Sequence, residues 1–201
     1  MNVAVLVSGS GTNLQAILDA EQAGALGAAR VVVVVSNVAG VRALERANAA
    51  GKRTEVLSHK PYPSRQAFDE ALVALLRKHD VELVALAGFM RLLTPAFLGA
   101  FPGRVVNIHP ALLPAFPGVH AQKQALDYGA RVTGCTVHFV DEGCDTGPII
   151  AQATVPVLDG DDEAALTARI LAEEHRLYPA AIRAIAEGRV QVTGRRVTIG
   201  S

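Results

Sequence analysis

Continuous valine-rich segments are the feature that most constrains the fold of this chain. The segments VAVLV (3–7), RVVVVVS (30–36), LVALAG (83–88) and VVNI (105–108) are apolar at nearly every position. A strand with one side in water would alternate apolar and polar residues, so these strands must be covered on both faces. Such strands are typical of a parallel sheet, and we expect an α/β fold.

Segments with helical periodicity alternate with these predicted strands. In 65–79, Phe68, Leu72, Leu75 and Leu76 recur at helical spacing, and Ser64 is placed to cap the first turn. Further helices are predicted at 14–23, 41–50, after a Thr94-Pro95 start, at 120–128 and from about 162. With a weak strand at 54–57 and later strands at 134–140 and 148–157, we predict a doubly wound, mostly parallel α/β sheet with a Rossmann-like N-terminal half and mixed C-terminal strands.

The C-terminal region carries two local signals. Pro179 lies inside the last predicted helix, and because proline lacks an N–H group we expect an interruption there, close to Glu174 and His175. The final segment RVQVTGRRVTI is predicted to form a hairpin that turns at Thr193-Gly194. No repeat or linker is evident, so we predict a single domain over residues 1–201.

Charge and composition exclude several classes of protein. The 201 residues include 19 Lys and Arg and 19 Asp and Glu, so we expect no nucleic-acid partner. No apolar run approaches the roughly 20 residues that cross a bilayer, and the start MNVAVLV lacks the basic region of a secretory signal. With only Cys135 and Cys144 as cysteines, we expect a cytoplasmic protein without a membrane partner.

The segment SGSGTN (8–13) follows the first predicted strand and precedes the first helix. A helix N-terminus offers unpaired N–H groups and glycine permits close approach, so this loop suits a single phosphate. It is not a dinucleotide fingerprint, because Leu14 stands where glycine is required, and it is not a P-loop, because it lacks a Gly-Lys pair. The alternative is a tight turn in which Thr12 or Asn13 caps the helix.

Polar residues end the apolar run at 105–108. Asn107 and His109 occupy alternate positions, so their side chains can project to the same side, and three following prolines stiffen the loop. Ligands of open α/β sheets bind outside the carboxyl ends of the strands. By itself, a histidine at a strand end is more often a surface or capping residue than a catalyst, so the interpretation of His109 depends on a partner.

The segment DEGCDTGP (141–148) supplies the candidate partner. If Asp145 reaches His109, the carboxylate stabilises the imidazolium. An amide, an imidazolium and a carboxylate together suit acyl transfer, since the first two stabilise an oxyanion and the last two move protons. For Asp141 and Glu142 a solvated turn is the competing interpretation.

The histidines and cysteines do not indicate a metal site. Neither C-x-x-C nor H-x-x-x-H spacing occurs, and His120 and His138 suit a cap or a core position as well as a ligand, so we expect no metal. Cys144, beside Asp145, is a candidate reactive thiol that lacks the second member of a nucleophilic motif.

Five segments, taken together, resemble the phosphoribosylglycinamide formyltransferase family: SGSGTNLQA (8–16), LAGFMRLL (86–93), VNIHPALLPAFPGVHA (106–121), GCTVHFVDEGCDTGPIIAQ (134–152) and EEHRLYP (173–179). The resemblance extends from residue 1 to about 190. It implies an enzyme of purine synthesis that transfers a formyl group from 10-formyltetrahydrofolate to the primary amine of glycinamide ribonucleotide. It also implies a phosphate-binding half over about 1–100, a folate and catalytic half over about 101–201, and a monomer or homodimer.

The resemblance assigns roles to particular residues. Asn107, His109 and Asp145 match the catalytic trio of the family. The residues that match its ribonucleotide site are Gly11, Thr12, Asn13 and Glu174. The residues that match its folate site are Arg65, Met90, Arg91, Leu92, Leu93, Asn107, Val140, Asp141, Glu142, Gly143, Cys144 and Asp145. By pattern alone Met90 and Leu93 also suit the core. Ala111 and Cys144 depart from the family, in which serine and an apolar residue are common there.

Three other functions compete with this one. A formyltetrahydrofolate deformylase has a similar core with water as acceptor, but its relatives carry an N-terminal regulatory domain, whereas the first strand here starts at Val3. A methionyl-tRNA formyltransferase adds a basic C-terminal RNA-binding domain, which this neutral chain ending at Ser201 is not expected to have. A sugar-phosphate-binding module would keep SGSGTN without needing Asn107, His109 and Asp145 together.

Overall fold

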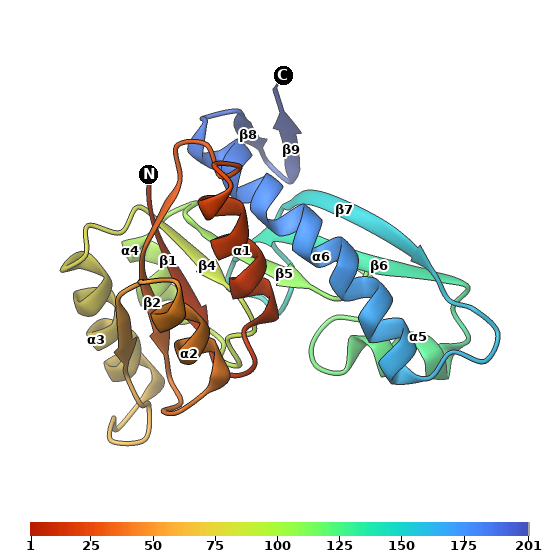
Figure 1. Ribbon diagram of the computed structural model, residues 1–201, viewed down its shortest axis with the longest axis horizontal. Coiled ribbons are helices and arrows are strands. Elements are labelled where there is room, and N and C mark those ends of the chain that lie inside the picture. The colour runs from red at the N-terminus through yellow and green to blue at the C-terminus, as the bar shows by residue number, and fades with distance from the viewer. Residues whose placement is uncertain (201) are drawn as a thin grey trace.

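A twisted seven-stranded sheet forms the centre of the computed structural model, which describes residues 1–200 (Figure 1). Its strands lie in the order β3-β2-β1-β4-β5-β6-β7, and a separate hairpin, β8-β9, follows the last helix. The elements in chain order are β1 (Asn2–Val7), α1 (Thr12–Gln22), β2 (Arg30–Ser36), α2 (Arg42–Ala49), β3 (Thr54–Val56), α3 (Arg65–Arg77), β4 (Leu83–Leu86), α4 (Pro95–Ala100), β5 (Val105–His109), α5 (Ala121–Tyr128), β6 (Val132–Phe139), β7 (Ile149–Pro156), α6 (Glu163–Ala186), β8 (Val190–Thr193) and β9 (Arg196–Ile199).

The directions of the strands confirm the predicted fold class. Strands β1 to β5 pair in parallel, whereas β6 and β7 are antiparallel to their neighbours. The valine-rich strands β1, β2 and β4 are buried along most of their length, as strands covered on both faces must be. The sheet is therefore a doubly wound α/β sheet with mixed C-terminal strands.

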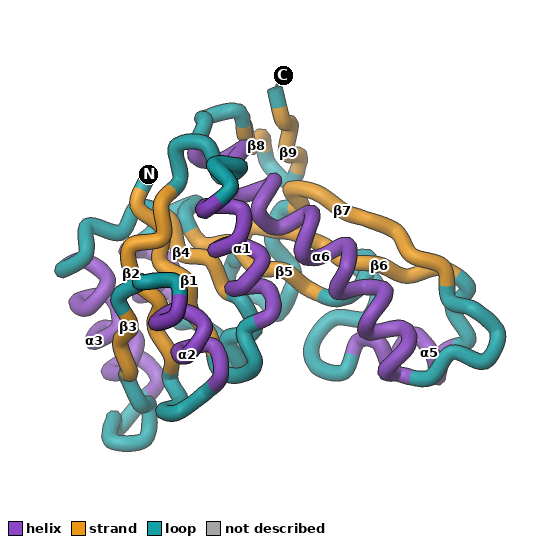
Figure 2. Tube along the Cα trace, in the orientation of Figure 1, coloured by secondary structure: helices purple, strands orange, loops and turns teal. Residues whose placement is uncertain are grey.

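Helices form a layer on each face of the sheet. Helices α1, α2 and α6 share one apolar core with the sheet, and α3 and α4 share a second core on the opposite face. In the orientation of Figure 1 the first group lies in front of the strands, and Figure 2 shows the same arrangement by secondary structure. The long helix α6 packs against α1 and also against β6 and β7, so it spans both halves of the sheet.

The ends of the helices and the C-terminal hairpin test the capping and turn residues predicted from the sequence. The Ser64 hydroxyl accepts a hydrogen bond from the N–H of Ala67, which confirms the predicted cap of α3. Thr94 is the N-cap residue of α4 and Pro95 is at its first position, but the Thr94 side chain makes no capping hydrogen bond. The hairpin at Thr193-Gly194 is confirmed, with β8 pairing antiparallel to β9.

The predicted interruption at Pro179 is wrong, because α6 continues through it from Glu163 to Ala186. Proline removes one backbone hydrogen bond, but Tyr178, Pro179 and Ile182 are all buried in this helix. Tertiary packing of this buried stretch therefore keeps the helix continuous. Within residues 1–200, no helix combines the length and the apolar character needed to cross a membrane.

Candidate active site

A cavity of about 230 Å³ opens where the loop after β1 meets the loop after β4. It is lined by residues 8–13 together with Ala87, Gly88 and Met90. Strands β1 and β4 are adjacent, and the winding of the chain reverses between them, since β2 lies on one side of β1 and β4 on the other. Such a switch point is where open α/β sheets bind their ligands.

Helix α2 holds the SGSGTN loop in shape. Gly11 has φ of 72°, and a Cβ atom placed on it would lie 2.6 Å from Cβ of Ala43 in α2. The N–H of Ala43 donates to the carbonyl of Gly9, and Nε of Arg46 donates to the carbonyl of Ser10 at 2.9 Å. Only glycine suits this position, because it tolerates both the left-handed backbone and the close approach.

The alternative in which Thr12 or Asn13 caps α1 is wrong. Gly11 is the N-cap residue, and no side chain caps this helix. The N–H groups of the first helical turn have no acceptors within the helix, and they lie beside the cavity. This end of α1 is therefore suited to an anion.

Asn13 instead joins the loop to α6. Its Nδ2 atom donates to Oε2 of Glu174 at 2.7 Å, across 161 residues of sequence. Glu174 is only 4% exposed, and this burial raises the pKa of its carboxyl to about 7, although the hydrogen bond from Asn13 acts in the opposite direction. The structure thus brings together Gly11, Thr12, Asn13 and Glu174, the four residues predicted for the ribonucleotide.

The side chains of Asn107 and His109 lie on one face of β5. Val106 and Ile108, at the alternate positions, belong to the core under α1 and α6, so Asn107 and His109 point to the opposite side of the sheet. Loop residues rather than a helix reach His109 there. Phe116 contacts the imidazole from the loop after β5, and Asp145 contacts it from the loop after β6.

A fourth residue, His138, links Asn107 to the Asp145 carboxylate that also contacts His109. The Nδ1 atom of His109 lies 3.3 Å from Oδ2 of Asp145. The Nε2 atom of His138 lies 3.2 Å from Nδ2 of Asn107 and 3.6 Å from Oδ1 of Asp145. His138 is buried and is the cross-strand neighbour of Asn107. Its core position was one of the two interpretations of the sequence, but only the β5-β6 register shows that it contacts this site.

Asp145 is held ionised by its surroundings. Partial burial by itself would raise the pKa of its carboxyl, but the contacts with His138, with the N–H of Gly118 and with His109 together lower the pKa to about 2. The backbone of Asp145 has φ of 55°, in the left-handed region that residues with a side chain seldom adopt. A non-glycine residue stays there only where surrounding contacts fix it, which is common at functional sites.

Both ring nitrogens of His109 face oxygen acceptors. Nε2 lies 2.8 Å from the carbonyl oxygen of Phe116, and Nδ1 lies beside the Asp145 carboxylate. Only the imidazolium has an N–H group on both sides to satisfy both oxygens. An imidazolium at this position would donate to both oxygens, and such a donor can stabilise a developing negative charge.

The residues predicted for the folate site lie on four segments: the start of α3, the loop after β4, Asn107 in β5, and the loop after β6. Nη2 of Arg65, at the start of α3, donates to the carbonyl of Leu92 at 3.3 Å, and the Arg91 guanidinium lies 4.7 Å from the centre of the Phe68 ring. Met90 and Leu92 are exposed, whereas the Leu93 side chain is buried in the core beneath α3 and α4. The core interpretation of Leu93 is thus confirmed, and that of Met90 is wrong.

The loop at 140–147 forms the other side of this region. Val140 packs against the same core that contains Leu93, and Asp141 accepts hydrogen bonds from the N–H of Gly143 and the hydroxyl of Thr146. Cys144 is exposed, with Sγ 3.6 Å from Oδ2 of Asp145. Burial and the nearby carboxylate raise the pKa of this thiol, which works against a reactive thiolate.

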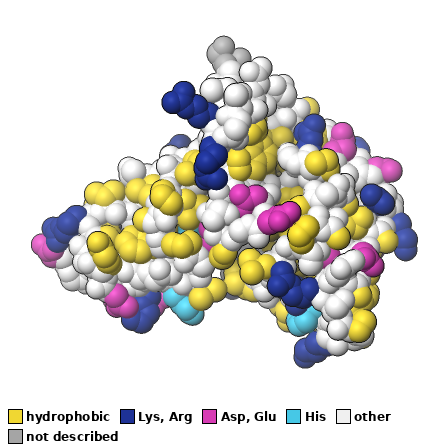
Figure 3. All heavy atoms as spheres, turned by 180° about the vertical axis from the view of Figure 1, so that it is seen from behind, with side chains coloured by type: hydrophobic (Ala, Val, Ile, Leu, Met, Phe, Trp, Pro, Cys, Tyr) yellow, Lys and Arg dark blue, Asp and Glu magenta, His cyan; other side chains and the backbone are white. Residues whose placement is uncertain are grey.

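No three His, Cys, Asp or Glu side chains within residues 1–200 are grouped to bind a metal ion. The surface opposite to the α1 and α6 layer carries basic and acidic side chains interspersed with apolar ones (Figure 3).

Comparisons with known proteins identify the family. The formyl transferase family model matches residues 1–182. The trifunctional purine biosynthetic protein adenosine-3 of Drosophila pseudoobscura pseudoobscura is 54% identical over 92% of this chain, which spans only 14% of that protein. The phosphoribosylglycinamide formyltransferase of Escherichia coli (strain K12) is 45% identical, over 96% of this chain and 90% of the relative. The crystal structure of glycinamide ribonucleotide transformylase 1 from Symbiobacterium toebii has a TM-score of 0.98 and 56% identity, covering 100% of this chain and 94% of that one. The chain therefore belongs to the formyl transferase family and, within it, to the phosphoribosylglycinamide formyltransferases.

Proposed function

We propose that this protein transfers a formyl group from 10-formyltetrahydrofolate to the amine of N1-(5-phospho-D-ribosyl)glycinamide in purine biosynthesis. The observation that carries the proposal is a chain of contacts: Asn107 contacts His138, His138 contacts Asp145, and Asp145 contacts His109. This set of groups suits acyl transfer to an amine, and it needs no nucleophilic side chain because the acceptor supplies its own. The family membership supports the same substrates.

The ribonucleotide binds between the loop after β1 and α6. Its phosphate lies at the N-terminus of α1, against the N–H groups that follow Gly11. The pair of Asn13 and Glu174 contacts the rest of the substrate, since it joins the same loop to α6. The amine of the substrate then points along the adjacent strands β4 and β5 toward Asn107.

The folate donor binds beside the loops after β4 and β6. Met90 and Leu92 present exposed apolar side chains there, next to Arg65 and Arg91. The residues at 140–145 close the other side, and Leu93 contributes through its packing. The formyl carbon is thereby presented to Asn107 and His109.

Transfer begins when the amine attacks the formyl carbon and forms the new C–N bond. The negative charge on the formyl oxygen is stabilised by the Asn107 amide and the His109 imidazolium, whose Nε2 exchanges the Phe116 carbonyl for the substrate oxygen. Asp145 keeps His109 charged and accepts, directly or through water, a proton from the attacking nitrogen. A proton returns to the folate nitrogen as its bond to the formyl carbon breaks. The positive charge comes from His109, so the proposal includes no metal.

Alanine substitution of the trio tests this mechanism. We expect Asn107→Ala, His109→Ala and Asp145→Ala each to lower kcat about 10²- to 10³-fold, the usual cost of one oxyanion donor, while the protein stays folded. The exposed His120, whose side chain makes no capping bond, provides a matched control as His120→Ala. Product formation is followed through the folate absorbance change. Full activity in His109→Ala would contradict the assignment.

The same assay separates transfer from hydrolysis of the donor. It is run with 10-formyltetrahydrofolate in the presence and absence of the ribonucleotide. We expect turnover only when the amine is present. Turnover that is independent of the amine would indicate a deformylase, and phosphate-ligand binding without any turnover would indicate a binding module.

A further inference from the structure

The C-terminal hairpin β8-β9 is fixed to the body of the protein at its base. The N–H of Gly200 donates to the carbonyl of Arg189 at 2.8 Å, and Nη1 of Arg189 donates to the carbonyl of Gly200. Val190 and Val197, one on each strand, pack against the core that contains α1 and α6. The hairpin is therefore a part of the folded domain and holds a fixed direction.

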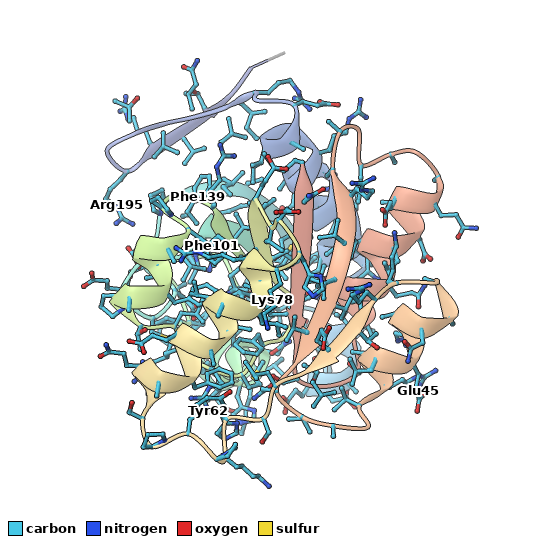
Figure 4. All side chains as sticks on the ribbon, turned by 90° about the vertical axis from the view of Figure 1, so that its left-hand side faces the viewer. Glu45, Tyr62, Lys78, Phe101, Phe139 and Arg195 are labelled. Carbon is cyan, nitrogen blue, oxygen red and sulfur yellow. The ribbon has the colours of Figure 1, made fainter. Side chains whose placement is uncertain are left out.

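The turn of this hairpin reaches the loop at 140–147. Nη2 of Arg195 donates to the carbonyl of Thr146 at 2.8 Å, across 49 residues of sequence. Figure 4 shows Arg195 extending from the turn to the neighbourhood of Phe139, the last residue of β6. This contact links a C-terminal element to the loop that carries Asp145.

The middle of the loop, at 142–146, has little packing of its own to hold it. Glu142, Gly143, Cys144 and Thr146 are all exposed. Internal hydrogen bonds from Gly143 and Thr146 converge on Asp141 and shape the loop, but they do not attach it to the rest of the protein. Exposed segments with few packed contacts open at low free energy, so an external tie has a large influence on such a loop.

The hydrogen bond from Arg195 lies next to Asp145, the most constrained residue of the loop. Asp145 has a left-handed backbone and directly precedes Thr146, whose carbonyl Arg195 holds. Its carboxylate is bound by the N–H of Gly118 and contacts His109. Fixing the Thr146–Gly147 peptide, one residue beyond Asp145, opposes relaxation of that strained backbone toward an ordinary conformation.

We propose that the β8-β9 hairpin supports the folate side of the active site and that Arg195 is a positioning residue, which shapes the 140–147 loop through the Thr146 carbonyl. The inference rests on the proposed function for its substrate, because it assigns the supported loop to the formyl donor. It involves no contact between Arg195 and either substrate. Its consequence is selective: the donor site depends on Arg195, and the ribonucleotide site, which lies on α1 and α6, does not.

Steady-state kinetics test this selectivity. We expect Arg195→Ala to raise the KM of the formyl donor about fivefold, the effect of losing one net hydrogen bond, and to leave the KM of the ribonucleotide unchanged. Arg195→Lys keeps a donor at the end of a long side chain, so it should recover part of the loss. Arg196, the next residue along the hairpin, is exposed and has no hydrogen bond or ion pair from its side chain within residues 1–200, which makes Arg196→Ala the matched control.

Amide hydrogen exchange of the free protein supplies a readout that does not depend on catalysis. Arg195→Ala should speed exchange in the 140–147 loop, above all at Gly143, and Arg196→Ala should not. Suppose that Arg195→Ala speeds exchange in the loop but the wild-type protein transfers no formyl group. The proposed function would then be wrong, whereas the claim that the hairpin supports the loop would still hold.

Two results would overturn the inference itself. One is an Arg195→Ala variant with unchanged loop exchange and an unchanged donor KM in an active enzyme. The other is a rise in both Michaelis constants together with a lower Tm that Arg195→Lys does not restore, because this would show general destabilisation.

Discussion

The buried carboxyl of Glu174 makes the stability of this protein depend on pH. Its pKa rises from the ordinary 4.5 to about 7 because burial disfavours the charged form. Below pH 4.5 the carboxyl is neutral in both states, and between 4.5 and 7 the unfolded chain loses its proton while the folded protein keeps it. The folded state is therefore destabilised progressively as pH rises through this range, by roughly 3 kcal/mol once the pH exceeds 7.

We predict that Glu174→Gln removes this dependence. Glutamine can still accept the hydrogen bond from Asn13 through its carbonyl oxygen, but it does not ionise. Relative to the wild type, the variant should gain stability between pH 5 and pH 8, which urea denaturation at both pH values measures. Glu173→Gln, which alters a surface ion pair with Arg176, should show no comparable gain. An equal change in both variants would contradict the assignment to Glu174.

For individual residues, the sequence predicted contacts that depend on a single strand. It missed contacts that depend on how two strands pair. Asn107 and His109 share a face because alternate residues of a strand always do. His138 could not be assigned to them, because the antiparallel pairing that puts it opposite Asn107 is a tertiary property. The sequence interpretation required Asp145 to reach His109, and in the structure the Asp145 carboxylate lies beside the His109 imidazole. The catalytic and binding roles of these residues remain predictions.

A buried hydroxyl connects helix α6 to two strands of the sheet. The Tyr178 O–H group lies 2.9 Å from the carbonyl of Leu86 in β4 and 3.1 Å from that of Val106 in β5, and the side chain is fully buried. These carbonyls belong to the strands that carry the loop at 87–94 and the catalytic candidate Asn107. The helix that bears Glu174 is thus aligned with the strand that bears Asn107.

We predict that Tyr178→Phe destabilises the protein by roughly 1–3 kcal/mol, because two buried carbonyl groups lose their shared donor while the ring volume is kept. Tyr128→Phe is the matched control, since the Tyr128 side chain is exposed. Urea denaturation of both variants measures the difference. If the two variants unfold at the same urea concentration as the wild type, the hydroxyl does not stabilise this junction.

The elements show where local signals suffice and where they do not. Ser64 was identified as a cap because capping acts over three residues, and the bond to Ala67 is present. Thr94 has the same kind of position, yet its hydroxyl is buried without a partner, so residue type alone does not form the bond. Pro179 failed as an interruption because the burial of α6 outweighs the loss of one backbone hydrogen bond.

For the whole molecule, the valine-rich runs and the helical segments between them were sufficient to predict a doubly wound sheet, because runs of this composition indicate strands covered on both faces. The order of the strands and the placement of α6 across both halves could not be read from these runs. The link from Arg195 to Thr146 is a similar case, since nothing in the local sequence marks a hydrogen bond across 49 residues. Contacts between distant segments are determined by packing, and periodicity describes only the segment itself.

The predicted halves, about 1–100 and 101–201, share one core. The core cluster with α1 and α6 includes residues from Val3 to Ile185, β4 pairs with β5 across the boundary, and α6 packs on α1. Neither half can bury its apolar surface without the other, so we predict a single cooperative unfolding transition. Cys135, buried in β6, reports on the second half through thiol labelling in a Cys144→Ser background, and amide exchange in β2 reports on the first half. Both should respond at the same urea concentration. Labelling of Cys135 while β2 remains protected would show instead that the C-terminal half unfolds independently.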